Sequence, residues 1–170
     1  IVIRFQGGSN AGQTIINPYG KFALHQLPSG VFHSHILNII GNGVALSPEK
    51  LVNELNALEE RGVPKPNLLV SNRAQVVMPY HIALDTYEEA RLSSKSFGST
   101  RSGIAPFYSD KFAKIGFQVS ELYEDEASLR DRIERMLAIK NTLLVNLYHQ
   151  PALTVDEVYN KLMEYKEQLA

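Results

Sequence analysis

The chain has 170 residues and a formal net charge of -1, from 17 basic and 18 acidic side chains. This length fits one domain, and charges this balanced exclude the dense basic face that bulk nucleic-acid binding requires. The sequence contains no cysteine, which excludes disulfides and thiolate metal sites. No apolar run approaches the roughly 20 residues of a membrane span, and we recognise no signal peptide. We therefore expect a globular cytoplasmic protein without nucleic-acid or membrane partners.

The chain opens on a short β-branched run, Ile1–Ile3, which predicts a buried strand. A loop with three glycines follows, and glycine lets a backbone take positive φ and approach a ligand closely. Small amide and hydroxyl side chains stand between and after these glycines: Ser9, Asn10, Gln13 and Thr14. Together they make a candidate phosphate or nucleotide cradle. The alternative is an ordinary connection between strands, which glycine content alone favours.

The next segments are strand-like. Residues 14–27 predict a β-hairpin, because Asn17–Gly20 combines a proline that presets φ with a glycine that supplies the reversal. A buried strand over Ile36–Ile40 should end in Gly41–Gly43 and resume at Val44–Leu46. Two further short strands complete the predicted set: Leu68–Ser71 and Gln75–Met78.

One helix is predicted between these strands. Ser47 is a suitable N-cap, Pro48 occupies the first helical position and Glu49 places an acid in the first turn. Gly62 and Pro64 should stop this helix.

The rest of the chain is expected to be mainly helical. Predicted helices cover His81–Leu92, a short irregular stretch at 104–116, Glu126–Tyr148 and a terminal segment after a capping box at Thr154–Glu157. The leucine face of residues 126–148 is assigned to the core, with a dimer interface as the alternative. Between these helices, Ser93–Gly103 is rich in hydroxyls and glycine, which predicts a mobile surface loop.

Strands first and helices afterwards indicate an α/β or α+β layered domain. We treat residues 1–170 as one domain in three parts. Residues 1–92 form a sheet-rich part, 93–111 a mobile Ser/Gly loop, and 112–170 a mainly helical part.

The string FQGGSNAGQT at residues 5–14 resembles the substrate loop of the adenylosuccinate synthetase family. That family pattern is an aromatic residue, Gln-Gly-Gly, any residue, then Asn-Ala-Gly-His-Thr. Further matches follow in the family's order: Leu27–Gly30, Ile40–Val44, Pro79–His81 with Leu84–Asp85, and Gly98–Thr100 with Gly103–Ile104, Pro106, Tyr108 and Asp110–Lys111. The blocks span most of the chain and are weakest in its C-terminal quarter. The resemblance implies a largely parallel central sheet with flanking helices, within a larger P-loop-type ligase.

Members of this family form adenylosuccinate from IMP, L-aspartate and GTP, with Mg²⁺ as cofactor. The resemblance places Asn10 and Ala11 against IMP, and Gly12, Gln13 and Thr14 beside the GTP phosphates. Gly12 and Gln13 would also touch IMP, and the carbonyl of Gly12 would hold Mg²⁺. The resemblance gives the IMP phosphate to Thr100 and implies a homodimer.

Three positions depart from the family pattern. Gln13 stands at the catalytic histidine, and a carboxamide can donate a hydrogen bond but cannot give up a proton near neutrality. General acid–base catalysis contributes about 10²–10⁴-fold, so we expect a large loss of activity. Ser102 and Lys114 both stand where the family has arginine. The arginine at the position of Lys114 reaches IMP across the dimer interface, and lysine keeps its charge without the bidentate fork.

The family's glycine-rich phosphate loop, with its catalytic Asp, precedes the first strand, and its guanine- and aspartate-binding segments follow position 170. We therefore expect part of a longer protein, one that is adenylosuccinate synthetase-like and impaired or inactive as this chain alone. The alternative is a non-catalytic, diverged module that binds a purine nucleotide or a partner. A third interpretation is a purely structural domain.

The remaining polar candidates are weaker. His33 and His35 lie on one face if they form a strand, but a zinc site needs three or four ligands. His25 and His81 are expected to be structural, with His81 as a helix cap. Glu88–Glu89 is interpreted as part of a solvated helix face.

Overall fold

A parallel sheet forms the centre of the strand-rich part. The computed structural model describes residues 1–167. Its strands β1 (Val2–Gly7), β4 (Leu37–Leu46) and β5 (Asn67–Val70) pair in the order β1-β4-β5, and the short β6 (Gln75–Val76) pairs with the far end of β4. All of these pairings are parallel, which confirms the predicted fold class.

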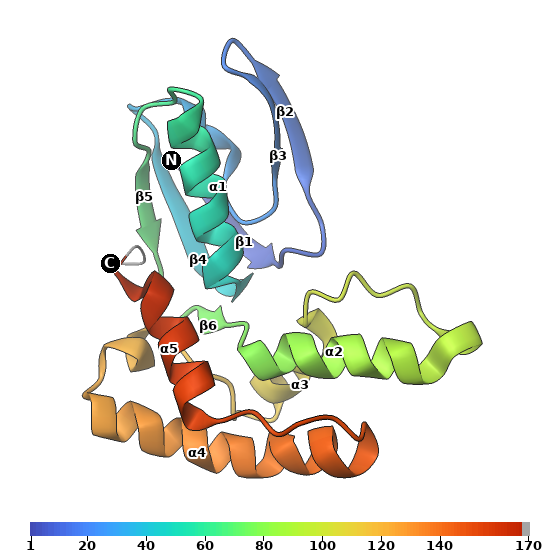
Figure 1. The fold of residues 1–170 in the computed structure, drawn as a ribbon. Helices are drawn as coiled ribbons and strands as arrows, with labels where there is room; N and C mark the ends of the chain where they lie inside the picture. The colour runs from blue at the N-terminus through green and yellow to red at the C-terminus, as the bar shows by residue number, and fades with distance from the viewer. Residues whose placement is uncertain (168–170) are drawn as a thin grey trace.

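The predicted hairpin is also present. Strands β2 (Gln13–Asn17) and β3 (Gly20–Leu24) pair antiparallel as a separate two-stranded sheet, which Figure 1 shows beside the parallel one. The amide of Tyr19 donates to Asn17 Oδ1 at 2.9 Å and closes the turn. Burial of Phe22 and Leu24 joins the hairpin to the core.

The prediction that strand β1 is buried is wrong for one of its two faces. Helix α1 (Pro48–Glu60) packs on one face of the sheet, where Ile40 and Leu51 belong to the same core. Because side chains alternate along a strand, Ile3 points to the opposite face and is 53% exposed. Pairing places Ile3 beside Ile39 and Ile39 beside Leu69, which is 55% exposed.

The predicted break in the middle strand is wrong, since β4 runs through Gly41–Gly43 without interruption. The glycines serve a close approach of two backbones instead. A Cβ at Gly43 would collide with the carbonyl oxygen of Phe5, and the β1–β4 register shifts between Arg4 and Gln6 at this level.

Helices make up most of the remaining chain (Figure 1). Their bounds are Pro79–Leu92 for α2, Ile104–Phe112 for α3, Glu126–Thr142 for α4 and Val155–Lys166 for α5. Short 3₁₀ segments lie at Ser29–Phe32, Ser93–Lys95 and Val119–Tyr123. None of the helices within residues 1–167 is long and apolar enough to cross a membrane.

The predicted helix caps are confirmed, but one helix is shorter than expected. Ser47 accepts from the amide of Lys50, and Thr154 and Glu157 form the reciprocal capping box. The α4 pattern ends at Thr142 and continues as a π-helical turn, Leu143–Leu147. The wider turn rotates its first and last residues off the buried stripe, so Leu143 and Leu147 are exposed rather than core, while Leu144 stays buried.

A buried charge network ties α2, α3 and α4 together. Asp110 of α3 accepts from His81 Nε2 at 2.8 Å and from Lys140 Nζ at 2.6 Å. His81 Nδ1 accepts from the amide of Met78, which confirms the predicted cap and leaves Nε2 as the donor. Burial lowers the pKa of His81, and Asp110 opposes this without reversing it. Burial alone would raise the pKa of Asp110, but hydrogen bonds from His81 and Lys140 hold it below its usual value.

This network predicts a pH-dependent stability. The unfolded His81 takes up a proton near pH 6.5, whereas the folded one does so only at lower pH. The stabilising contribution is therefore complete above about pH 6.5 and is lost as the pH falls. His81→Gln should lower the free energy of unfolding at pH 8 by about 1–3 kcal/mol and flatten its decline between pH 7 and 5.

Urea denaturation across this pH range measures both effects. His33→Gln serves as the control, because His33 is exposed and its replacement should leave the decline unchanged. A decline of equal steepness in His81→Gln and the unsubstituted protein would contradict the assignment.

Candidate functional site

The candidate site lies where parallel strands end. β1 and β4 run in the same direction, so the loop after Gly7 and the start of α1 after Leu46 meet at one edge of the sheet. In open α/β sheets, ligands bind outside the carboxyl ends of the strands. The edge therefore has the expected location for a ligand site.

The glycine loop is half packed and half open. Gly7 takes φ 88°, and the guanidinium of Arg4 donates to the carbonyl of Gly8 at 3.1 Å. Gly8 and Ser9 are buried, and a Cβ at Gly8 would lie 2.6 Å from Ile104 Cδ1 at the start of α3. By contrast, residues 10–14 are exposed, so the predicted ligand-facing part of the loop is accessible to solvent.

Gln13 is held by the segment that follows the hairpin. Its Nε2 donates to the carbonyl of Leu27 at 3.3 Å, and the amide of Leu27 donates to Glu54 Oε2 at 2.9 Å. The amides of His25 and Gln26 also donate to the Glu54 carboxylate. Helix α1 thus fixes, through Glu54, the backbone that orients Gln13.

The Ser/Gly tract is fastened to α2 by two carboxylates. Glu89 Oε1 accepts from the amides of Gly98 at 2.6 Å and Ser99 at 3.1 Å, and Oε2 accepts from Phe97 at 3.3 Å. Asp85 accepts from the Ser99 hydroxyl at 2.7 Å and from the amide of Gly103 at 2.9 Å. The interpretation of Glu89 as a solvated residue is wrong, because it is buried under this loop.

A cation and two hydroxyls converge on the far side of the same tract. Thr100 Oγ1 donates to Ser102 Oγ at 3.1 Å, and Lys50 Nζ of α1 donates to the same oxygen at 3.3 Å. Ser102 is buried, whereas Thr100 is exposed. With Ile104 packed on Gly8, the structure brings the glycine loop, α1 and the tract to one place.

Other predicted residues lie apart from this group. Lys114 is exposed beyond the end of α3 with φ 61°, and no hydrogen bond from its side chain is found within residues 1–167. The rings of His33 and His35 are 5.8 Å apart, but the described part of the chain contains no group of three or more His, Cys, Asp or Glu that could hold a metal ion.

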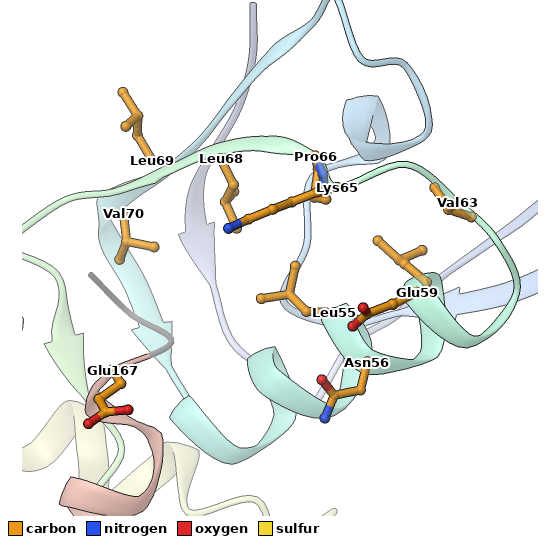
Figure 2. Close-up of a pocket in the computed structure, with 11 residues that line it drawn as sticks. Leu55, Asn56, Glu59, Val63, Lys65, Pro66, Leu68, Leu69, Val70 and Glu167 are labelled. Atoms are coloured by element: carbon orange, nitrogen blue, oxygen red, sulfur yellow. The ribbon is translucent and has the colours of Figure 1, made fainter.

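Two cavities lie outside the group. Figure 2 shows the larger, of about 730 Å³, where Leu55 of α1 faces Leu68 and Val70 of β5 across an opening rimmed by Lys65. The smaller, of about 460 Å³, lies between α2, α3 and α4, and its lining includes Phe97 and Ser99 of the tract together with Asp85 and Glu89, which hold the tract. Neither contains a residue that the family pattern assigns to substrate.

We compared the sequence and the fold with those of known proteins. The family model described as Adenylosuccinate synthetase matches residues 1–170. The chain belongs to the adenylosuccinate synthetase family. It is 45% identical to the adenylosuccinate synthetase of Dehalococcoides mccartyi over 169 residues, 99% of this chain and 40% of that protein. It is 42% identical to the adenylosuccinate synthetase of Bacillus thuringiensis over 170 residues, 100% of this chain and 39% of that protein.

Solved structures agree. The fully ligated adenylosuccinate synthetase of Plasmodium falciparum matches with a TM-score of 0.79 at 28% identity, covering 98% of this chain and 38% of that one. The succinoaminodeoxyadenylate synthetase of cyanophage S-2L matches at 0.53 and 18% identity, over 99% and 53% of the two chains, which supports the fold alone. This chain thus spans about two fifths of the length of its curated synthetase relatives.

Sequence reasoning gave no role to three polar residues of this segment, Asp85, Glu89 and Lys50, although Asp85 belongs to a matched motif block. Asp85 and Glu89 stand four apart on α2, one helical turn, directly before a glycine-rich tract whose amides need acceptors. That spacing is a signal that could have identified them. Lys50 gives no comparable signal, because its partner Ser102 lies 52 residues away.

We expect the hydrogen bonds that Glu89 accepts to keep the tract ordered. Glu89→Gln keeps the side-chain shape but replaces one acceptor oxygen by a donor and removes the charge, and hydrogen bonds to charged groups contribute about 1.5–3 kcal/mol. Amide hydrogen exchange of Gly98 and Ser99 should therefore accelerate roughly 10-fold or more. Exchange measured by mass spectrometry or NMR reports this directly.

Glu88→Gln is the matched control. Glu88 is the neighbouring residue on α2 but bonds to Arg91 and Tyr148 instead of the tract. Its replacement should leave exchange in residues 97–99 unchanged. Equal exchange in the two variants would show that Glu89 does not order the tract.

Proposed function

We propose that the protein carrying this chain acts in purine nucleotide biosynthesis as an adenylosuccinate synthetase, converting IMP, L-aspartate and GTP to adenylosuccinate, GDP and phosphate. Family membership supports the reaction class. The observation that carries the proposal is that the glycine loop, through Gly8 packed on Ile104, and the Lys50–Ser102–Thr100 contacts lie together at one edge of the parallel sheet.

The chain's own residues would bind and orient the substrates. Asn10 and Ala11 would contact IMP, and Thr100 would hold its phosphate. Gln13 and Thr14 would lie beside the GTP phosphates. Because the carboxamide of Gln13 donates hydrogen bonds without releasing a proton, it would stabilise charge on a phosphate oxygen rather than act as an acid.

Magnesium would need ligands beyond these residues. The ion prefers near-octahedral oxygen coordination and is bound through carboxylates, waters and substrate phosphates. Within residues 1–167 no cluster of three ligating side chains is found, so Gly12 would supply one carbonyl and the nucleotide phosphates further oxygens. The metal would neutralise phosphate charge when bound. Homodimer formation, with Lys114 reaching a partner's IMP, and a cytoplasmic location remain predictions from the family.

A second candidate function is a non-catalytic module that binds a purine nucleotide or a partner protein. The observation in its favour is Gln13, since its Nε2 is engaged with the carbonyl of Leu27 and the residue cannot donate a proton. The tract and loop would then retain binding without turnover.

Substitution of Gln13 separates the two candidates. In the intact protein, Gln13→His should raise the rate of adenylosuccinate formation by about 10²–10⁴-fold, because it restores a group that titrates near neutrality. The rate is measured from the absorbance of adenylosuccinate with IMP, aspartate and GTP present. Gln150→His, a matched substitution remote from the loop, should leave the rate unchanged.

The binding of IMP completes this test. Calorimetric titration that detects IMP in both forms, with no turnover in either, would favour the non-catalytic module. Absence of both turnover and IMP binding would refute the proposed function.

A further inference from the structure

Lys50 occupies an unusual position for a lysine. It lies in the first turn of α1, where its amide donates to Ser47 Oγ. A cation at a helix N-terminus opposes the helix dipole. The residue therefore contributes less to helix stability there than a neutral or acidic side chain would, and its charge needs a partner elsewhere.

No carboxylate supplies that partner. Glu54 stands four residues along the same helix, where an ion pair with Lys50 could form, but its oxygens accept the amides of residues 25–27. Among the salt bridges within residues 1–167, none includes Lys50. The ammonium instead reaches the hydroxyl of Ser102 at 3.3 Å.

Ser102 stands where the family pattern has arginine, so position 102 itself carries no charge, and the neighbouring cation of the tract, Arg101, is exposed. Because Lys50 Nζ and Thr100 Oγ1 both donate to Ser102 Oγ, the ammonium lies one hydroxyl away from Thr100. An ammonium has three donor hydrogens, and Ser102 uses one of them. Two remain for an oxyanion.

On the opposite side of the tract, two carboxylates already have hydrogen-bond donors. Asp85 and Glu89 accept the amides of residues 97–99 and 103, so both acids contact the tract from α2, whereas Lys50 reaches Ser102 from α1. The Lys50 ammonium and the hydroxyls of Thr100 and Ser102 thus lie on one side of the loop, and the two carboxylates with the Ser99 hydroxyl lie on the other.

We propose that Lys50 binds a substrate oxyanion at the Thr100–Ser102 turn, supplying from α1 the positive charge that Ser102 cannot. This inference rests on the proposed function and adds to it a substrate-binding residue outside the family motif blocks. The oxyanion is either the phosphate of IMP or a carboxylate of L-aspartate, which share the same chemistry.

The test compares binding by the intact protein and its variants. Lys50→Met keeps the length of the side chain and removes the charge, Lys50→Arg keeps the charge, and Lys65→Met is a surface control from the larger cavity. Calorimetry measures the affinity for IMP, for inosine, which lacks the phosphate, and for L-aspartate in the presence of IMP.

If the phosphate is the oxyanion, Lys50→Met should weaken IMP binding roughly 10-fold or more and leave inosine binding unchanged. If the carboxylate is the oxyanion, only aspartate binding weakens by that factor. Lys50→Arg and Lys65→Met should resemble the unsubstituted protein. Adding Ser102→Arg to Lys50→Met should restore affinity, since the charge then returns from the tract.

Unchanged affinity of Lys50→Met for both IMP and aspartate would overturn the proposal. Equal weakening of IMP and inosine binding would also overturn it, because a purely structural contact would not distinguish charged from uncharged ligands. If the unsubstituted protein binds neither IMP nor aspartate, the proposed function fails, and inorganic phosphate followed by ³¹P NMR becomes the probe. Binding of phosphate that Lys50→Met abolishes would then still support an oxyanion site. Binding that is absent, or independent of Lys50, would exclude it.

Discussion

The candidate site depends on the parallel pairing of β1 with β4. Parallel strands bring their carboxyl ends to the same edge, so the glycine loop after β1 and the α1 N-terminus after β4 must meet there. The two strands can pair alongside Phe5 only because Gly43 has no side chain that would collide with the Phe5 carbonyl. A larger residue at position 43 would separate the strands at the point where the loop begins. Glycine here therefore serves sheet geometry before it serves any ligand.

The second requirement is that the amides of the Ser/Gly tract and the buried charges find partners. The Ser/Gly tract has few apolar side chains to fix it, and its amides would otherwise face the side of α2 without acceptors. Glu89 and Asp85 supply those acceptors. The same rule governs Asp110, whose buried charge is matched by Lys140 and by a neutral His81. In both cases the polar contacts join segments that hydrophobic packing alone would leave loosely defined.

Features with local causes could be predicted from the sequence, and features with distant causes could not. The hairpin turn and the Ser47 cap follow from residues within a few positions of one another, and both are present. The exposure of Ile3 depends on which sheet face α1 covers, and β-branched composition does not specify that. Burial of Glu89 depends on a loop that returns eight to ten residues later. The motif blocks located the loop and Thr100, but not Lys50, whose contact spans the sequence from α1 to the tract.

Helix α1 joins these observations. Its charges at positions 50 and 54 have the spacing of an intrahelical ion pair, yet they point to different segments. Glu54 gathers the amides of residues 25–27, which hold the carbonyl that Gln13 contacts, and Lys50 reaches the turn at Ser102. An ion pair on the helix surface would contribute roughly 0.2–0.5 kcal/mol, less than either charge-assisted contact to a partly buried group. Bonding Lys50 and Glu54 to different segments therefore stabilises the fold more than an ion pair between them would. One helix thereby sets the distance between the Gln13 side of the site and its hydroxyl-rich side.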